Sequence, residues 1–142
     1  MVRNHIMLTG ALLCALVGLI SCRQANTPSA RTGKLPLGSV GPPAASAILK
    51  GHALVGGWAI HESGVESVEL YVDRDFVLDA GIGVDRPDVA KVFPAFRKEA
   101  ISGWNALLDT TRLSEGDHEL VARVRTKDGS YRDFAVPFKV AR

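Results

Sequence analysis

A strict alternation of apolar and polar residues in the C-terminal two thirds of the chain constrains the fold more than any other feature. Residues 66–73 divide into an apolar set and a polar set, Val68, Leu70, Val72 and Glu69, Tyr71, Asp73. The same period of two recurs over 76–82, 119–125 and 133–140. Because successive side chains of a β-strand point to opposite faces, each segment is predicted to be a strand with one buried face.

Two further strands are expected at 53–60 and 102–108, around Trp58 and Trp104. Both tryptophans are expected to be structural, because an aromatic side chain buries ~150–250 Å² and dominates a small core. Turn-forming residues separate the strands, at 62–64, 115–117 and 127–130. About seven short strands in one domain predict an all-β fold, an antiparallel β-sandwich.

One segment breaks the period of two. Residues 86–93 are predicted to form a short helical insertion. Asp85 is placed to cap its start, and Pro94 is expected to end it. Arg86 and Asp88 are expected to hold this helical loop against the sandwich.

An ordered series of short motifs covers nearly all of 48–140. It comprises Gly56-Gly-Trp-Ala59, Ser63-Gly-Val-Glu-Ser-Val-Glu-Leu-Tyr-Val-Asp73, Arg86-Pro-Asp-Val89, Ser102-Gly-Trp104 and Leu108-Asp-Thr-Thr111. The series resembles the bacterial immunoglobulin-like domains that are appended to many cell-surface and secreted proteins. The resemblance implies an immunoglobulin-like sandwich that serves as a spacer, display or adhesive module, and it implies no catalytic residues.

The N-terminus is predicted to be a processing signal, residues 1–21. Arg3 precedes an apolar run, 6–20, that is shorter than the ~20 residues a membrane-spanning helix needs. A basic start, a short apolar middle and a small-residue exit are typical of a secretory signal peptide.

The exit, Leu19-Ile20-Ser21-Cys22, resembles the lipobox of bacterial lipoproteins. The resemblance implies that Cys22 is lipidated and becomes the new N-terminus. Arg23 is not the Asp that retains such proteins at the inner membrane, so the outer membrane is favoured. The alternative is an ordinary secreted protein with an incidental cysteine. Residues 22–44, rich in Pro, Gly, Ser and Thr, are interpreted as a lipidated cysteine and flexible tether, and 45–142 as the folded domain.

The charge distribution argues against nucleic-acid binding. Four of the 17 basic residues precede residue 45, which leaves 13 basic against 15 acidic residues for the expected domain. A slightly acidic domain lacks the basic surface that neutralises phosphates.

The candidate ligand platform consists of outward-facing residues on two strands that would be neighbours in an immunoglobulin-like sheet. Glu69, Tyr71 and Asp73 lie on one strand, and Arg123 and Arg125 lie on the other. These side chains either form a polar platform for a protein or glycan ligand, or they merely form charge pairs that keep the sheet soluble.

No metal, cofactor or catalytic centre is expected. His52, His61 and His118 lack the spacing of zinc ligands, and His118 is expected to cap a strand end. Calcium binding by Asp73 and its neighbours Asp75 and Asp79 is disfavoured by the intervening Arg74. No nucleophile-elbow sequence or phosphate-binding loop is present. The sequence therefore predicts a membrane-tethered, non-catalytic binding or structural module of the cell envelope, with a protein partner. A carbohydrate-binding accessory module serving an enzyme is the alternative.

Overall fold

A computed structural model describes residues 34–99 and 102–142, without the side chains of 97–99. The expected signal peptide (residues 1–21), Cys22 and the first part of the expected tether lie outside these residues. The described part holds nine strands and one α-helix: β1 Leu37–Val40, β2 Ala47–Leu49, β3 His52–Ile60, β4 Val65–Val72, β5 Asp75–Asp79, β6 Gly81–Val84, α1 Pro87–Val92, β7 Gly103–Asp109, β8 Gly116–Thr126 and β9 Tyr131–Val140. Two 3₁₀ segments, Pro94–Glu99 and Thr110–Arg112, complete it.

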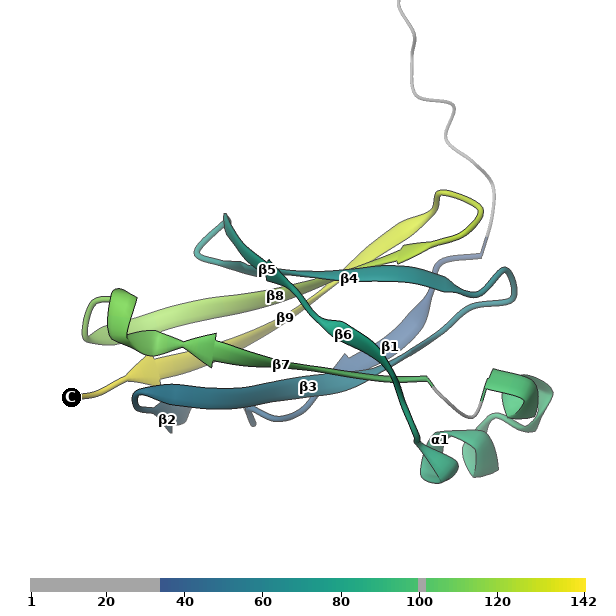
Figure 1. Ribbon diagram of the computed structural model, residues 1–142, viewed down its shortest axis with the longest axis horizontal. Helices are drawn as coiled ribbons and strands as arrows, with labels where there is room; N and C mark the ends of the chain where they lie inside the picture. Colours follow the sequence, from purple (N-terminus) through teal and green to yellow (C-terminus); the bar gives the residue numbers. More distant parts are fainter. Residues whose placement is uncertain (1–33, 100–101) are drawn as a thin grey trace, which may run out of the picture. The chain divides into compact units, whose positions relative to one another are not determined.

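The strands form the two layers of a β-sandwich, which confirms the predicted fold class (Figure 1). One sheet has the order β1-β3-β7-β6, and the other has the order β2-β9-β8-β4-β5. All neighbouring strands are antiparallel except β2, which runs parallel to the end of β9. In Figure 1, β4, β8 and β9 lie in the upper layer and β3 and β7 in the lower layer.

The core lies between the sheets and is built from the alternating residues. Val68, Leu70 and Val72 of β4 are at most 3% exposed, as their period of two predicts. Trp104 on β7 is also buried and belongs to the same core. Trp58 on β3 is half-buried instead, and its ring lies 5.5 Å from that of Phe93, centroid to centroid. Trp58 thus packs against the loop that follows α1.

The sandwich begins before residue 45. Part of the segment that was interpreted as a tether therefore belongs to the folded domain. Strand β1 pairs with β3 from Leu37 opposite Ile60 to Val40 opposite Gly57. Its close approach depends on Gly57, where a Cβ would lie 2.1 Å from the carbonyl oxygen of Ser39. Residues 37–40 therefore belong to the folded domain.

The segment 76–82 was expected to be one strand, but it is two strands in different sheets. Strand β5 pairs with β4, and β6 pairs with β7 in the opposite sheet. The crossing occurs at Ala80, whose N–H donates to the carbonyl of Val68 at 2.8 Å. A β-bulge also leaves Val77 without a partner on β4, so Phe76 turns to the outer face and is 55% exposed.

The helical insertion is confirmed as α1, followed by the 3₁₀ segment 94–99, and it lies at one end of the sandwich (Figure 1). Its N-cap is Arg86 rather than Asp85, and no side chain caps the helix. Arg86 Nε and Nη2 donate to both carboxylate oxygens of Asp88, at 2.9 and 2.7 Å. This pair was expected to tie the loop to the sandwich, but it lies within the loop. It is the aliphatic part of Arg86 that approaches the sheet, against Gly103.

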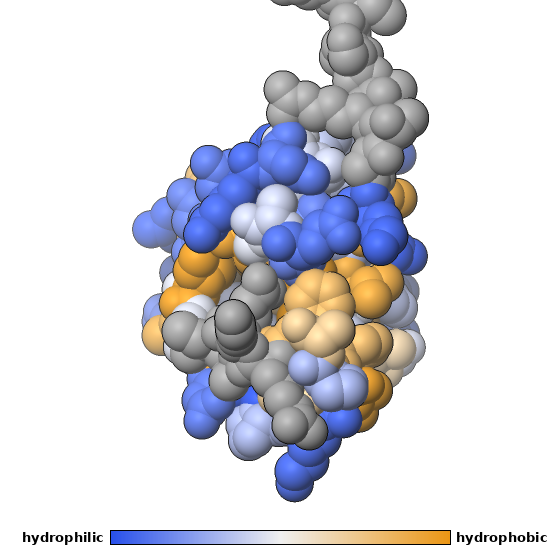
Figure 2. Space-filling model, turned by 90° about the vertical axis from the view of Figure 1, so that its right-hand side faces the viewer, coloured by the Kyte–Doolittle hydropathy of each residue, from blue (hydrophilic) through white to orange (hydrophobic). Residues whose placement is uncertain are grey.

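The surface is unevenly polar. Viewed from the end that carries α1, hydrophilic residues gather on the side of β4, β8 and β9, and hydrophobic residues occupy the middle (Figure 2). In the part of the chain that the structure describes, no helix is long and apolar enough to cross a bilayer.

Candidate functional site on the outer face of the five-stranded sheet

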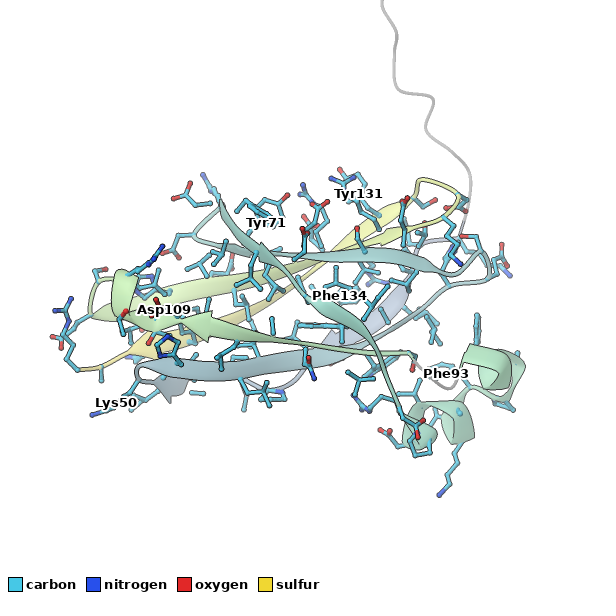
Figure 3. The ribbon with its side chains drawn as sticks, in the orientation of Figure 1. Lys50, Tyr71, Phe93, Asp109, Tyr131 and Phe134 are labelled. Atoms are coloured by element: carbon cyan, nitrogen blue, oxygen red, sulfur yellow. The ribbon has the colours of Figure 1, made fainter. Side chains whose placement is uncertain are left out.

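Strands β4 and β8 bring most of the predicted platform together. They are antiparallel neighbours, with Glu69 opposite Arg123 and Ser67 opposite Arg125. Since the core residues of both strands point inward, these side chains share the outer face of the sheet. Tyr71 and Tyr131 project from that face, away from the core (Figure 3).

Glu69 is the acceptor at the centre of one half of the platform. Arg125 donates from Nε to Oε1 and from Nη2 to Oε2, and Tyr71 donates its hydroxyl to Oε2 at 2.8 Å. The hydrogen bond from Arg125 lowers the pKa of Glu69. The bond to Glu69 raises the pKa of Tyr71. Glu69 therefore stays ionised and Tyr71 stays a neutral donor at physiological pH.

Arg123 occupies the centre of the other half. Its Nε and Nη2 donate to the two carboxylate oxygens of Asp133 on β9, both at 2.8 Å. The Cζ atom of the guanidinium lies 5.1 Å from the ring centroid of Tyr71 and 4.9 Å from that of Tyr131. Both distances fall within the range of cation–π attraction. A planar guanidinium can make a bidentate pair and stack on aromatic rings at the same time, whereas a lysine ammonium has no such planar fork.

Three residues of this face, Phe76, Tyr131 and Asp133, were missed by the sequence analysis. Phe76 meets the ring of Tyr71 edge-on at 5.7 Å between centroids. Phe76 and Tyr131 are 55% and 52% exposed. Asp133 lies opposite Arg123 of β8. It could have been predicted, because the alternation of residues along β9 places it on the outer face. Phe76 could not, because its orientation depends on the bulge.

Asp73, in contrast, does not belong to the platform. It lies in the β4–β5 turn with φ of 51°, and its carboxylate accepts from His118 Nδ1 and from the N–H of Glu119 at 3.0 Å. His118 Nε2 donates to the carbonyl of Ser114 at 2.9 Å. Its ring also stacks on Phe138 at 5.6 Å between centroids. The expected strand-end role of His118 therefore matches its contacts.

The His118 cluster contains a serine, a histidine and an aspartate, but its geometry is not that of a nucleophile and its base. Both ring nitrogens face oxygen acceptors, an arrangement that favours the cationic imidazole, in which neither nitrogen can act as a base. The hydrogen bond to Asp73 raises the pKa of His118 accordingly. The Ser114 hydroxyl is 3.5 Å from Nε2, which already bonds to the serine's own carbonyl.

The platform combines balanced charges with exposed aromatic rings. Its two arginines and two carboxylates, Arg123, Arg125, Glu69 and Asp133, balance in charge. Exposed tyrosine and phenylalanine rings lie among them. Tyr and Arg are the residues that most often supply binding energy at protein interfaces. Among the described residues, no group of three or more His, Cys, Asp or Glu side chains is arranged to hold a metal ion.

The opposite sheet has a different exposed surface. Leu54 and Leu107 lie directly opposite each other on β3 and β7 and are 60% and 59% exposed. The two outer faces of the sandwich are therefore chemically distinct, and each provides control positions for experiments on the other.

Of three matches to solved structures, the two with TM-scores above 0.5 support the fold. The endo-β-1,4-mannanase from Thermotoga petrophila matches over 75% of this chain, with a TM-score of 0.56 and 16% identity, and the match covers 20% of that chain. The fibronectin(III)-like modules of Clostridium thermocellum CbhA also match over 75% of this chain, with a TM-score of 0.52 and 16% identity, and 46% of theirs is covered. CopC from Methylosinus trichosporium OB3b matches over 73% of this chain and 93% of its own, with a TM-score of 0.40 and 18% identity.

At these identities the similarity is one of fold. The chain spans about a fifth of the mannanase and less than half of the CbhA modules. No protein-family model matches the chain, and no curated protein matches it.

Proposed function

We propose that this protein is a non-catalytic binding module of the bacterial cell envelope, held at the membrane by lipid on Cys22. It presents the outer face of its five-stranded sheet to a protein partner. The observation that supports this most is the placement of Arg123 between Tyr71 and Tyr131, with Asp133 holding the guanidinium in a fixed plane. Such a preorganised, half-exposed aromatic–arginine surface costs little side-chain entropy to dock.

The charge balance of the platform bears on the kind of partner. A face whose ion pairs are already satisfied does not attract a strongly charged polymer at long range. Such a face suits a partner surface that makes aromatic contacts and forms hydrogen bonds with the exposed edges of the existing ion pairs. The exposed rings of Phe76 and Tyr131 are the expected contact points.

Site-specific photo-crosslinking in intact cells tests the binding face. A benzophenone amino acid replaces Phe76 on the platform in one variant and Leu107 on the opposite sheet in the other. The proposal expects a discrete protein crosslink from position 76 and none of the same size from position 107. Adding Arg123→Ala should abolish the crosslink, because it removes the cation between the two rings. Arg112→Ala, which removes an exposed arginine elsewhere, should leave it intact. Equal crosslinking from both faces would contradict the proposal.

The exposed rings of Phe76 and Tyr131 favour a second candidate, a carbohydrate-binding accessory module. An amphipathic aromatic face offers an apolar plane to a sugar ring, with polar groups at its edge. Glycan-array binding that Tyr131→Ala removes, without any protein crosslink from position 76, would favour this alternative.

A further inference from the structure

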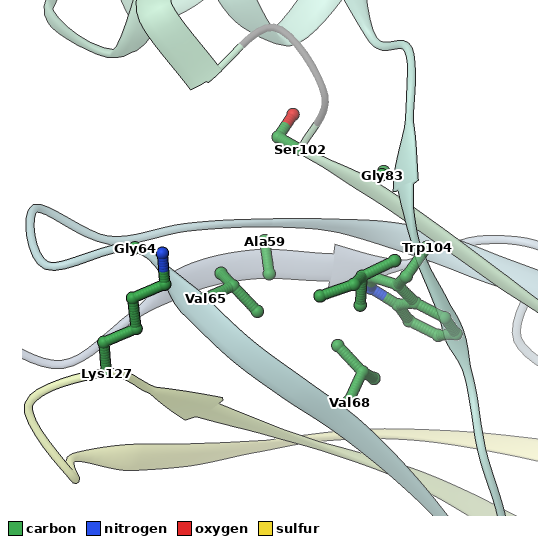
Figure 4. Close-up of a pocket in the computed structure, with 10 residues that line it drawn as sticks. Ala59, Gly64, Val65, Val68, Gly83, Ser102, Trp104 and Lys127 are labelled. Atoms are coloured by element: carbon green, nitrogen blue, oxygen red, sulfur yellow. The ribbon is translucent and has the colours of Figure 1, made fainter.

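A cavity of about 270 Å³ opens between the two sheets, away from the platform. Its walls come from β3, β4, β6 and β7 and from the β8–β9 turn, and residues from these elements are drawn in Figure 4. Its apolar lining is provided by Ala59, Val65, Val68, Ile82 and Trp104. At ~30 Å³ per water-sized volume, it has room for roughly nine non-hydrogen atoms.

The cavity contains an unpaired donor. Trp104 is 3% exposed, and its Nε1 has no hydrogen-bond partner among the described residues. Figure 4 shows this nitrogen on the side of the ring that faces Val65 and Val68. A buried indole N–H normally finds an acceptor. The lining also contains the Ser102 hydroxyl, but it too is without a partner among the described residues, so an occupant with an acceptor oxygen would meet the need of Trp104.

A cation lies on the other side of the cavity. The Lys127 side chain lies flat against Gly64, where a Cβ would be 3.3 Å from its Cδ and Cε and 3.4 Å from its Nζ. The backbone N–H of Lys127 also donates to the Gly64 carbonyl at 3.1 Å. Figure 4 shows Lys127 and Trp104 on opposite sides of the pocket, with Val65 between them. The ammonium has no carboxylate within ion-pair distance in the described part of the chain.

We propose that this cavity binds a small apolar carboxylate that carries a second oxygen at the opposite end of its body. The carboxylate pairs with Lys127, the apolar body lies against Val65, Val68 and Ile82, and the distal oxygen accepts from Trp104 Nε1. This pattern, an apolar cleft with a few convergent polar groups, is that of a small-molecule site.

A set of three matched probes separates the two polar contacts. 4-Hydroxybenzoate has both features, benzoate lacks the distal hydroxyl, and 4-hydroxybenzyl alcohol lacks the charge. Each probe is titrated into the protein as it is purified from the cells that produce it, labelled with ¹⁵N-tryptophan. The indole N–H signals are followed by NMR. The chain has two tryptophans, so two indole signals appear, and Trp58 serves as the internal control.

We expect 4-hydroxybenzoate to shift the Trp104 signal saturably and to bind about threefold to tenfold more tightly than either of the other probes. Lys127→Gln should remove the preference for 4-hydroxybenzoate over the alcohol. Lys139→Gln, on the other face of the five-stranded sheet, should not. Trp104→Phe should remove the preference for 4-hydroxybenzoate over benzoate, measured by the change in probe relaxation.

Three results would overturn the proposal. One is an unshifted Trp104 signal with all three probes at tens of millimolar. Another is an equal shift of the Trp58 signal, which would mark nonspecific association. The third is an unchanged probe preference in Lys127→Gln, a surface substitution that keeps the test valid even if Trp104→Phe fails to fold.

Discussion

His118 shows most clearly how single residues determine the properties of this molecule. Its side chain is 6% exposed, yet its contacts favour the charged form, because Asp73 and the Ser114 carbonyl are acceptors for its two ring nitrogens. The interaction with Asp73 joins the β4–β5 turn to β8. It also holds Asp73 in a left-handed conformation, which Asp tolerates better than most residues.

This ion pair predicts a pH-dependent stability. The pKa of His118 is higher in the folded protein than its unfolded value of 6.5. The stability that His118 contributes is therefore fully present below pH 6.5 and is lost as the pH rises through the pKa of the folded state. The pKa of Asp73 is lower in the folded protein than its unfolded value of 3.8. The stability that Asp73 contributes is therefore fully present above pH 3.8 and is lost as the pH falls through the pKa of the folded state. The pair should stabilise the fold most between these limits. Since Asp73 is half exposed, we expect an effect of about 1 kcal/mol or less.

Asp73→Asn tests this, because Asn also tolerates a positive φ but carries no charge. Urea unfolding at pH 5.5 and pH 8.5 should show that the parent protein loses stability toward pH 8.5 and that the variant loses less. A parallel pH dependence in the two proteins would contradict the account. Asp79→Asn, which removes an exposed carboxylate on β5 that does not contribute to the raised pKa of His118, is the matched control.

At this scale the sequence predicted some positions and not others. Glu69, Tyr71, Arg123 and Arg125 were placed on one face because alternation is a local property. Asp73 was assigned to the same face by alternation, but the turn that begins after Val72 changes the direction of its side chain. Such a change depends on a positive φ, which the period of two does not encode.

Strand β1 packs against β3 through two close glycines, Gly38 and Gly57, of which Gly57 makes the closer approach. Gly57 on β3 faces both β1 and the core, where a Cβ would lie 2.1 Å from the Ser39 carbonyl oxygen and 2.7 Å from the Trp104 ring. The backbone atom cannot move without separating β1 from the sheet. Only a residue without a side chain permits this packing.

Gly57→Ala is therefore expected to destabilise the protein by about 1–3 kcal/mol, the usual cost of overpacking. Gly41→Ala is the control, since a Cβ there would meet nothing within 4 Å. Denaturant midpoints followed by tryptophan fluorescence measure both. Equal midpoints for the two variants would show that β1 is not packed as described.

The elements that the sequence missed have two physical causes. β1 and β2 are four and three residues long, too short to establish a period, and their partners lie far along the chain. The division of 76–82 at Ala80 was missed because the apolar pattern continues across it. Longer strands such as β8 and β9 keep a recognisable alternation even where one residue departs from it, and they were predicted correctly.

For the whole molecule, the proposed anchor makes a separate prediction. If Cys22 carries lipid, Cys22→Ser should release the protein from the membrane fraction, because two or more acyl chains are needed for stable attachment. Ala30→Ser, an equally small substitution further along the expected tether, should leave it in the membrane. Fractionation followed by mass analysis of the N-terminal peptide measures both. Unchanged membrane retention of Cys22→Ser would contradict the anchor.

The central claim, that the molecule functions through the outer face of its five-stranded sheet, can be tested without knowing the partner. Hydroxyl-radical footprinting compares side-chain oxidation in intact cells with that of the purified protein. The account predicts that Phe76 and Tyr131 are oxidised several-fold more slowly in cells, while Leu54 and Leu107 on the other sheet are oxidised at similar rates in both. Protection of the leucines instead, or equal oxidation of all four in cells and in isolation, would contradict it.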